Sequence, residues 1–322
     1  AVSSALDIPD LLRQAGAQVT DLNGSRRAYR VDLRAFGATA GLNTLVLVDG
    51  RRVNQPDLSG SDWAQIPLHR VARIEVMRGS GATLFGDNAS GGVINIITTA
   101  GGDPQTRVGV RGGSFGTITP EASTSGSRGG VSYALSGRSH RSDGHRDNAR
   151  TNGGDVGGQF AVRPNTTFDV NVSAGFHADR TGLPGALKAS DLASGVARSA
   201  TLTPDDFNDV DDGYVMVTRS KNASVPASSS ARRGASSRDA LVDVSVRQRD
   251  SHFFSTFSGG EFTGDTGLRT VAVSPKVALR LATGSFGHTL VAGADMTSAE
   301  EDVRNLPTFG GFPDEGLFTL QK

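Results

Sequence analysis

The 322-residue chain contains no cysteine, a single tryptophan and only three tyrosines. Without cysteine, it can form no disulfide framework, thiolate metal site or thiol nucleophile. Lysine plus arginine equals aspartate plus glutamate, at 33 each, so no net positive charge draws the chain to nucleic acid. No apolar run approaches the ~18 residues that a membrane-spanning helix needs. A membrane β-barrel remains possible, because its lipid-facing side chains occupy only alternate positions.

Residue patterns for catalysis and metal binding are also missing. The six histidines are scattered, and none forms a metal-ligand pair. Ser59-Gly60-Ser61 lacks the Gly-x-Ser-x-Gly pattern of a hydrolase nucleophile. We therefore expect no enzyme activity, no cofactor and no bound metal. Five aspartates leave two alternatives, a calcium site or a solvated acidic loop, and their spacing does not fit an EF-hand and favours the loop. They are Asp205, Asp206, Asp209, Asp211 and Asp212.

Glycine, in contrast, is abundant. The 42 glycines are too many for a helical protein and are typical of many short strands joined by turns. They are dense between Arg78 and Thr99, in the order Arg78-Gly79, Leu84-Phe85-Gly86 and Gly91-Gly92. Such density predicts turns with positive φ or backbone that lies close to other atoms. The β-branched run Val93–Thr99 that follows predicts a buried strand.

The first 77 residues predict one helix and two strands. Ile8, Leu11, Leu12 and Ala15 fall at helical spacing, after a capping Asp7 and before Gly16. Thr44–Val48 reads as a buried strand closed by an Asp49-Gly50 turn, and Val71–Met77 as an alternating strand. A polar segment, 51–63, separates them and contains the only tryptophan.

From residue 101 onward, apolar and polar residues alternate. The runs are 131–135, 156–162, 168–177, 242–246, 271–281 and 290–296. The longest are 9–11 residues, long enough to cross a bilayer at a tilt, and their polar positions carry charges that suit a water-filled lumen. A soluble β-sandwich is the alternative, and the scarcity of Tyr and Trp favours it. We favour the barrel, and we expect 179–214 and 219–239 to be long connections on its outer side.

The pattern between Arg78 and Thr99 resembles the end of the plug domain of TonB-dependent outer-membrane receptors. That pattern is Arg-Gly, then Leu-Tyr-Gly, then Gly-Gly-Val-Ile-Asn-Ile-Ile-Thr, and Phe85 here replaces its tyrosine. A dinucleotide or phosphate loop fails, because Leu84 stands where a third glycine belongs and no Gly-Lys-Ser/Thr follows. The resemblance covers residues 8–99 and is similar to the cobalamin-receptor branch. Ala35 departs from it by replacing a glycine of an Ile-Arg-Gly-Phe-Gly element.

The resemblance implies a mixed α/β plug domain, 1–100, followed by an antiparallel, all-β transmembrane β-barrel in 101–322. Barrels of this kind have about 22 strands, and the residues after Pro104 suffice for about half of them, ten or eleven. We therefore expect the chain to be part of a longer receptor and to lack the segment that contacts TonB. The eight signature residues of the plug would be structural: Arg78, Gly79, Leu84, Phe85, Gly86, Gly91, Gly92 and Asn95.

The resemblance also implies a function, active uptake of a ferric siderophore or a cobalamin across the bacterial outer membrane. The implied partners are the TonB complex, a small metal-chelate or corrinoid ligand and membrane lipid. Ligand contacts are expected in the polar segment, from Asn54, Gln55, Asp57, Ser59, Ser61 and Trp63. The alternative is that Trp63 packs into the plug. Two other functions stay open, a plug-like binding protein without coupled transport and a passive porin.

Overall fold

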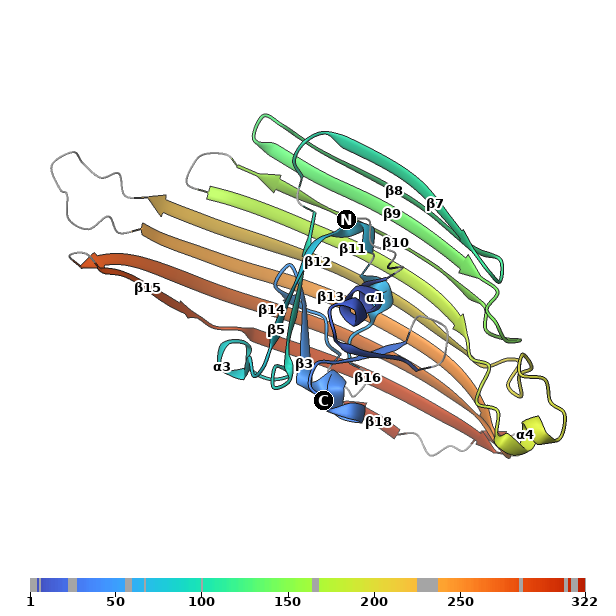
Figure 1. Cartoon of the computed structure of the whole chain (residues 1–322). Coiled ribbons are helices and arrows are strands. Elements are labelled where there is room, and N and C mark those ends of the chain that lie inside the picture. The colour runs from blue at the N-terminus through green and yellow to red at the C-terminus, as the bar shows by residue number, and fades with distance from the viewer. Residues whose placement is uncertain are drawn as a thin grey trace.

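The computed structural model describes residues 5, 7–22, 28–55, 60–66, 68–99, 101–163, 168–224, 237–283, 286–309, 312–313 and 318–321. These residues form a small mixed α/β unit and a large curved antiparallel sheet (Figure 1). We call the first the plug unit, up to Thr99, and the second the curved sheet, from Gln105 on. Among the described helices, none has the length and apolar character to cross a membrane.

The plug unit contains every element that the sequence predicts for it. Its helices are α1 (Ile8–Gln14), α2 (Ala40–Asn43) and α3 (Ala82–Phe85), with 3-10 turns at Gly37–Thr39, Trp63–Gln65 and Leu68–Arg70. Its strands are β1 (Gln18–Asp21), β2 (Tyr29–Asp32), β3 (Thr44–Val48), β4 (Arg51–Arg52), β5 (Val71–Arg78) and β6 (Gly92–Thr98). Four of these make a sheet in the order β4-β3-β6-β5, in which β3 and β6 are parallel.

Local sequence explains these boundaries. The Asp7 side chain caps α1 by accepting from the backbone N–H of Asp10 at 2.8 Å, as predicted. Asp49 and Gly50 both have positive φ, at 52° and 86°, which gives the tight hairpin between β3 and β4. Asp49 also accepts from the backbone N–H and the hydroxyl of Thr98, at 2.8 and 2.6 Å, so the turn is fastened to the end of β6.

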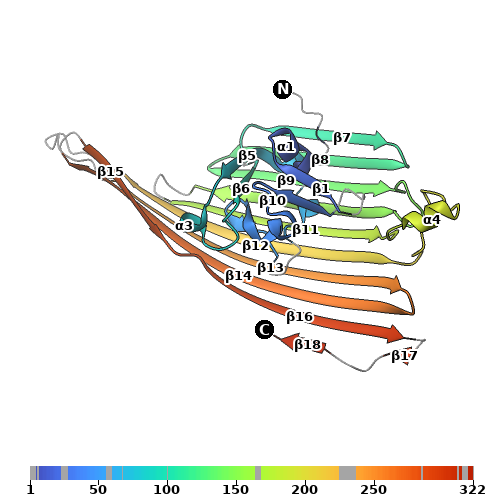
Figure 2. The same ribbon diagram turned by 60° about the horizontal axis from the view of Figure 1, so that its bottom comes forward.

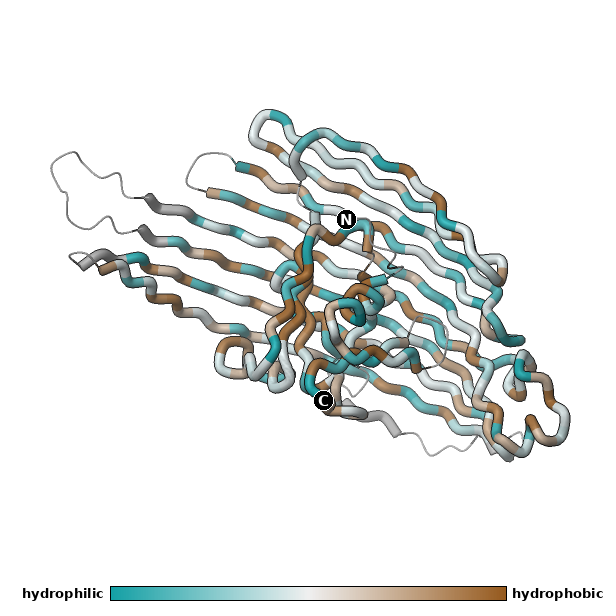
Figure 3. Tube along the Cα trace, in the orientation of Figure 1, coloured by the Kyte–Doolittle hydropathy of each residue, from teal (hydrophilic) through white to brown (hydrophobic). Residues whose placement is uncertain are grey.

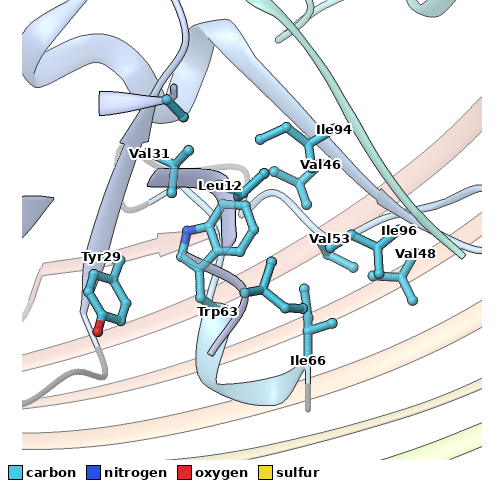
Figure 4. Packing of buried hydrophobic residues seen from close by; sticks show 12 residues of the cluster. Leu12, Tyr29, Val31, Val46, Val48, Val53, Trp63, Ile66, Ile94 and Ile96 are labelled. Carbon is cyan, nitrogen blue, oxygen red and sulfur yellow. The ribbon is translucent and has the colours of Figure 1, made fainter. Parts of the chain in front are cut away.

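The core of the plug unit lies between α1 and the four-stranded sheet. All five residues of β3 are buried, and Ile94 and Ile96 of β6 are fully enclosed. Figure 4 shows Trp63 among these side chains, beside Leu12 and Val46. An almost continuous apolar strand is what a strand covered on both faces requires.

The curved sheet consists, within the described residues, of twelve strands. They are β7 (Gln105–Gly113), β8 (Thr117–Arg128), β9 (Val131–Ser142), β10 (Thr151–Val162), β11 (Phe168–Gly182), β12 (Phe207–Ser224), β13 (Ser237–Phe257), β14 (Gly260–Thr283), β15 (Phe286–Gly293), β16 (Met296–Phe309), β17 (Phe312–Pro313) and β18 (Phe318–Gln321). Neighbours in sequence pair antiparallel from β7 to β14. Both β15 and β16 pair with β14, so they form one long partner strand that is interrupted at Ala294 and Asp295. The strand predicted at 290–296 crosses this interruption.

The predicted alternation is confirmed on β11 and β13, whereas all residues of β15 are exposed, so burial does not alternate in the predicted run at 290–296. On β13, Val246 is 41% exposed and the next residue, Arg247, only 4%. Phe176 and His177 of β11 differ in the same way. Figure 3 shows the alternating hydropathy along the strands, and Figure 2 shows the plug unit in the hollow of the sheet. The polar faces of the strands therefore point at the plug unit and the apolar faces point away.

The two long connections predicted from composition are shorter than expected. Residues 179–182 belong to β11 and 207–214 to β12, so the first connection is 183–206, which contains α4 (Ala189–Ala193). The second loses 219–224 to β12 and 237–239 to β13, and 225–236 lie outside the described residues. β11 ends and β12 begins at the end of the sheet that carries α4, whereas β12 ends and β13 begins at the opposite end, because successive antiparallel strands turn at alternate ends (Figure 1). The expectation that both lie on one outer side is wrong.

The five aspartates near this connection do not converge on a common point. Asp206 is 4% exposed and accepts from the backbone N–H and hydroxyl of Thr256, both at 2.8 Å. Asp212 is 2% exposed and binds the Arg247 guanidinium. Adjacent strand residues point to opposite faces, which separates Asp211 from Asp212. The solvated-loop interpretation is thus wrong for Asp206 and Asp212, and no cluster of metal-ligating side chains occurs in the described residues.

Candidate functional site

The glycine signature shapes the junction where β6 enters the plug sheet. Gly92 has φ of +150°, and a Cβ there would lie 2.5 Å from the carbonyl oxygen of Met77 and 2.6 Å from Leu33 Cδ1. A Cβ on Gly91 would lie 2.8 Å from the carbonyl oxygen of Asn43. The predicted close approach of backbone is therefore confirmed at both glycines.

Other signature residues fasten neighbouring elements together. The Arg78 guanidinium donates to the carbonyl of Ala15 at the end of α1. Asn95 Nδ2 donates to Glu75 Oε2 at 3.0 Å and so connects β6 to β5. The hydrogen bond from Arg73 lowers the pKa of Glu75, and the bond from Asn95 lowers it further by a smaller amount. Gly79 and Gly86 have positive φ, at 114° and 76°. Phe85 packs against the smaller core cluster, whereas Leu84 is 74% exposed.

The departure at Ala35 has a visible conformational cost. Ala35 has φ of +60°, in the left-handed region that glycine tolerates and alanine does not favour. Asp32 holds this turn by accepting from the backbone N–H groups of Arg34 at 3.0 Å and Gly37 at 2.7 Å. Burial raises the pKa of the Asp32 carboxyl, but the backbone donors outweigh it and the pKa lies below its ordinary value.

The plug unit is fastened to the curved sheet through residues 62–70. The Asp62 carboxylate pairs with the Arg249 guanidinium of β13 at 2.8 Å. The carbonyl of Ala64 accepts from Arg138 of β9 at 3.3 Å. Arg70 donates to the Tyr214 hydroxyl of β12 at 3.1 Å. Each contact is polar, so the two bodies meet through hydrogen bonds and ion pairs rather than through a shared apolar core.

On the curved sheet, the residues that contact segment 62–70 include members of one row of directly opposed residues. Six residues on consecutive strands, β8 to β13, face one another in register: Glu121, Arg138, Asp155, His177, Asp212 and Arg249. Their charges largely alternate, and Arg138 Nε binds Asp155 Oδ2 at 2.8 Å. Directly opposed charges of opposite sign stabilise a sheet. Asp62 and the Ala64 carbonyl therefore each bind an arginine of this row, Arg249 and Arg138.

Arg51 makes a further contact between the two bodies. Its guanidinium lies 3.9 Å from the centre of the Tyr214 ring, and the residue is 8% exposed. Burial lowers the pKa of Arg51 to about 10, although the neighbouring Tyr214 and Asp212 favour its charged form. The sequence places Arg51 and Asp62 in the polar segment but gives no signal that they contact strands more than 150 residues away.

A cavity of about 520 Å³ lies between the plug unit and the curved sheet. From the plug unit it is lined by Tyr29, Gln55, Ser61 and Asp62 among others, and from the sheet by Asp179, Thr181, Asn208, Arg249 and Phe253 among others. Several of the sheet residues are close to the ends of β11 and β12, next to connection 183–206. Its volume lies within the range of small-molecule sites, about 300–1,000 Å³.

The cavity includes two of the six residues predicted to bind ligand. Gln55 Nε2 and Ser61 Oγ are buried and find no hydrogen-bond partner among the described residues. Such groups are costly to bury without a partner, and a ligand's polar atoms can supply one by accepting from Gln55 Nε2 or by bonding to Ser61 Oγ. Asp57 and Ser59 lie outside the described residues.

The remaining two predicted residues are parts of the plug's framework. Asn54 accepts from the backbone N–H of Val46 at 2.7 Å and donates to the carbonyls of Gly41 and Thr44, at 3.1 and 2.9 Å. Trp63 is 5% exposed and packs in the core (Figure 4). Trp63 is therefore enclosed in the core and not presented to a ligand, because burial of so large a ring removes a large apolar surface from water. The alternative, that Trp63 packs into the plug, agrees with the structure.

Residues 2–93 match the family described as the TonB-dependent Receptor Plug Domain. The vitamin B12 transporter BtuB of Vibrio cholerae serotype O1 is 42% identical over 99 residues, which are 30% of this chain and 16% of that protein. BtuB of Photobacterium profundum is 38% identical over 127 residues, or 39% of this chain and 20% of that protein. The matched segments thus span a fifth or less of the length of these relatives.

Solved structures share the fold over nearly the whole chain. The ferric citrate transporter FecA in its unliganded form superposes with a TM-score of 0.83 at 18% identity, over 99% of this chain and 49% of that one. FpvA of P. aeruginosa bound to a heterologous pyoverdine gives 0.74 at 15% identity, over 98% and 45%. The plug match and the relatives identify residues 2–93 as a TonB-dependent receptor plug domain that is similar to that of cobalamin receptors, and the solved structures show that the chain has the fold of such a plug seated in part of a β-barrel.

Proposed function

We propose that the protein takes up a scarce nutrient complex, a cobalamin or a ferric chelate, across the outer membrane in a TonB-dependent way. The observation that carries this proposal is the cavity between the plug unit and the curved sheet, with Gln55 and Ser61 on one side and Arg249 on the other. A ligand bound there touches both bodies at once. Its presence can therefore alter how firmly the plug is held.

The contacts that hold the plug suit reversible movement. Ion pairs and hydrogen bonds at Asp62, Ala64 and Arg70 can be exchanged for water, whereas a dry apolar interface would have to expose hydrophobic surface. A barrel wide enough for such ligands would leak without a plug. We infer that the inner-membrane TonB complex, energised by the proton-motive force, pulls the plug from its N-terminal side once ligand is bound.

No covalent step is required in this scheme. The protein's own residues bind the ligand, orient it and hold or release the plug. The relatives named above are likewise transporters and receptors.

Uptake measurements test the proposal. A strain that lacks its own receptors is complemented with the gene that encodes this chain and is given radiolabelled cobalamin or a ferric siderophore, with and without a protonophore. Energy-dependent accumulation of one ligand is the expected result. Binding without energy-dependent accumulation would instead support the alternative of a plug-like binding protein, and neither binding nor uptake of either ligand class would contradict both.

A further inference from the structure

The outward face of the curved sheet carries an apolar band with charged margins. On β11 and β12 the band includes Val172, Ala174, Phe176, Val215 and Val217, which point away from the plug unit. At the end of the sheet that carries α4, it stops at Arg180 and at Asp211. At the opposite end, it stops at Arg219 and Lys221 of β12. A band of this kind is the surface that a barrel presents to lipid, and its margins lie at the level of the headgroups.

At the margin opposite α4, two cations share one aromatic ring. The Arg219 guanidinium lies 5.0 Å from the centre of the Phe168 ring, and the Lys221 ammonium lies 5.5 Å from it. Lys221 is directly opposite Phe168 in the sheet, whereas Arg219 is opposite Val170, two residues further into the band. Its guanidinium therefore reaches along the sheet toward the margin, as long basic side chains do at membrane interfaces.

Neither cation is neutralised by a carboxylate of the residues that the structure describes. No carboxylate of the described residues forms an ion pair with Arg219 or Lys221, and both residues are exposed. The neighbouring Asp169 pairs with Arg163 at 3.1 Å. On its other side, Arg219 is opposite Val242 of β13, so it is flanked by apolar residues in the register. Two unpaired positive charges next to an apolar band match an anion that is itself attached to a hydrocarbon chain.

The margin at the α4 end provides an internal comparison. There the Arg180 guanidinium lies 4.2 Å from the centre of the Phe207 ring, which is a similar cation–aromatic contact. It also pairs with the Asp209 carboxylate at 3.3 Å, so its charge is already balanced. The two margins thus share the aromatic contact and differ in whether the protein supplies the counter-charge.

We propose that Arg219, Lys221 and Phe168 form a binding site for the headgroup of an anionic phospholipid, whose acyl chains lie along the apolar band. Two cations attract a headgroup of net negative charge more strongly than a zwitterionic one. The cations attract the phosphate, and the ring fixes both of them at the height where the headgroup lies. Location at the edge of the band favours a lipid phosphate over a free phosphate ion, because only the lipid also covers the valines. This inference concerns the lipid-facing surface and does not depend on which nutrient is transported.

Native mass spectrometry of the full chain in neutral detergent tests the proposal, with phosphatidylglycerol and phosphatidylcholine as probes. We expect the first phosphatidylglycerol to bind more tightly than phosphatidylcholine, and Arg219→Ala/Lys221→Ala to weaken it about tenfold. Arg180→Ala should change its affinity by less than about twofold. The conservative variant Arg219→Lys/Lys221→Arg should retain the preference, and excess inorganic phosphate should not displace the lipid.

The opposite results would overturn the site. Equal affinity of the native chain for the two lipids would do so without any variant, which covers the case in which the double variant fails to fold. An equal loss of phosphatidylglycerol affinity in Arg180→Ala would show that the lipid responds to overall surface charge and not to this site. Displacement of the lipid by inorganic phosphate would indicate a free-anion site instead.

Discussion

Asp62 of the plug and Arg249 of β13 form an ion pair at 2.8 Å, although 187 positions separate them in the sequence. Both side chains also line the cavity between the plug and the wall. Arg249 lies 3.4 Å from a second carboxylate, Asp212, so it keeps a partner if Asp62 withdraws. One ion pair between the plug unit and the curved sheet therefore lies on the surface that a ligand in the cavity would contact.

A double-mutant cycle measures what this pair contributes. Because both side chains are largely buried, we expect a coupling free energy of about 1–3 kcal/mol between Asp62→Asn and Arg249→Gln. Trp63 is the only tryptophan and lies in the plug core, so its fluorescence during urea unfolding reports on the plug. The exposed pair Arg73–Glu75, which also lies in the plug, is the control and should couple much more weakly. Equal coupling in both cycles would contradict the assigned role of Asp62.

Gly92 should resist substitution by any residue with a Cβ. Gly92→Ala must move the Met77 carbonyl and the Leu33 side chain, and it also places alanine at φ of +150°. We expect the plug to lose more than about 1 kcal/mol of unfolding free energy. Gly102 has open space around its Cβ position and no positive φ, so Gly102→Ala serves as the control and should be near neutral. A Gly92→Ala variant as stable as the native chain would refute this account of the signature.

Replacement of Ala35 by glycine should increase the stability of the plug. The left-handed conformation costs alanine about 1–2 kcal/mol, and the greater freedom of unfolded glycine offsets about 0.5–1 kcal/mol of that. We expect Ala35→Gly to stabilise the plug by about 0.5–1 kcal/mol in urea unfolding. Ala82→Gly, in the short helix α3, is the control and should destabilise it. A destabilised Ala35→Gly variant would show that the turn is not strained.

Asp32 should make the plug's stability depend on acid pH. The folded pKa of this carboxyl lies below its ordinary value of 3.8, so its charged form stabilises the fold above about pH 4, and this contribution is lost as pH falls through the folded pKa. We expect Asp32→Asn to lower stability at pH 6 and to reduce the further loss between pH 5 and pH 3. Identical pH profiles for variant and native chain would contradict this assignment.

Substitutions of residues that line the cavity should weaken ligand binding, whereas substitutions in the plug core should lower stability. Gln55→Ala and Ser61→Ala remove buried polar atoms that lack partners, so we expect little change in stability and about tenfold weaker ligand binding. Trp63→Ala should instead destabilise the plug by about 3–5 kcal/mol, because it empties a large space in the core. Normal ligand affinity in the Gln55→Ala/Ser61→Ala variant would show that the ligand binds outside this cavity.

Local patterns in the sequence predict most of the plug and the strand character of the wall. The capped helix at Ile8, the buried strand at Thr44 and the β-branched run after Gly92 each depend on neighbours a few residues away. The row from Glu121 to Arg249 could not be predicted, because it depends on the register of six strands. The inward position of Trp63 could not be predicted either, since the polar residues around it give no sign that its ring packs into the core. The 1–100 and 101–322 boundary remains a prediction, with β6 ending at Thr98 and β7 beginning at Gln105.

The most direct test of the central claim is uptake by a receptor whose plug is tied to its wall. Arg70 and Tyr214 lie 3.1 Å apart outside the ligand cavity, and these 322 residues contain no cysteine, so Arg70→Cys/Tyr214→Cys adds two neighbouring thiols that a reducible bis-maleimide can link. The rate of energy-dependent ligand uptake is measured before linking, after linking and after reduction. We predict that linking stops uptake but not surface binding, and that reduction restores uptake; unchanged uptake by the linked protein would contradict transport through movement of the plug.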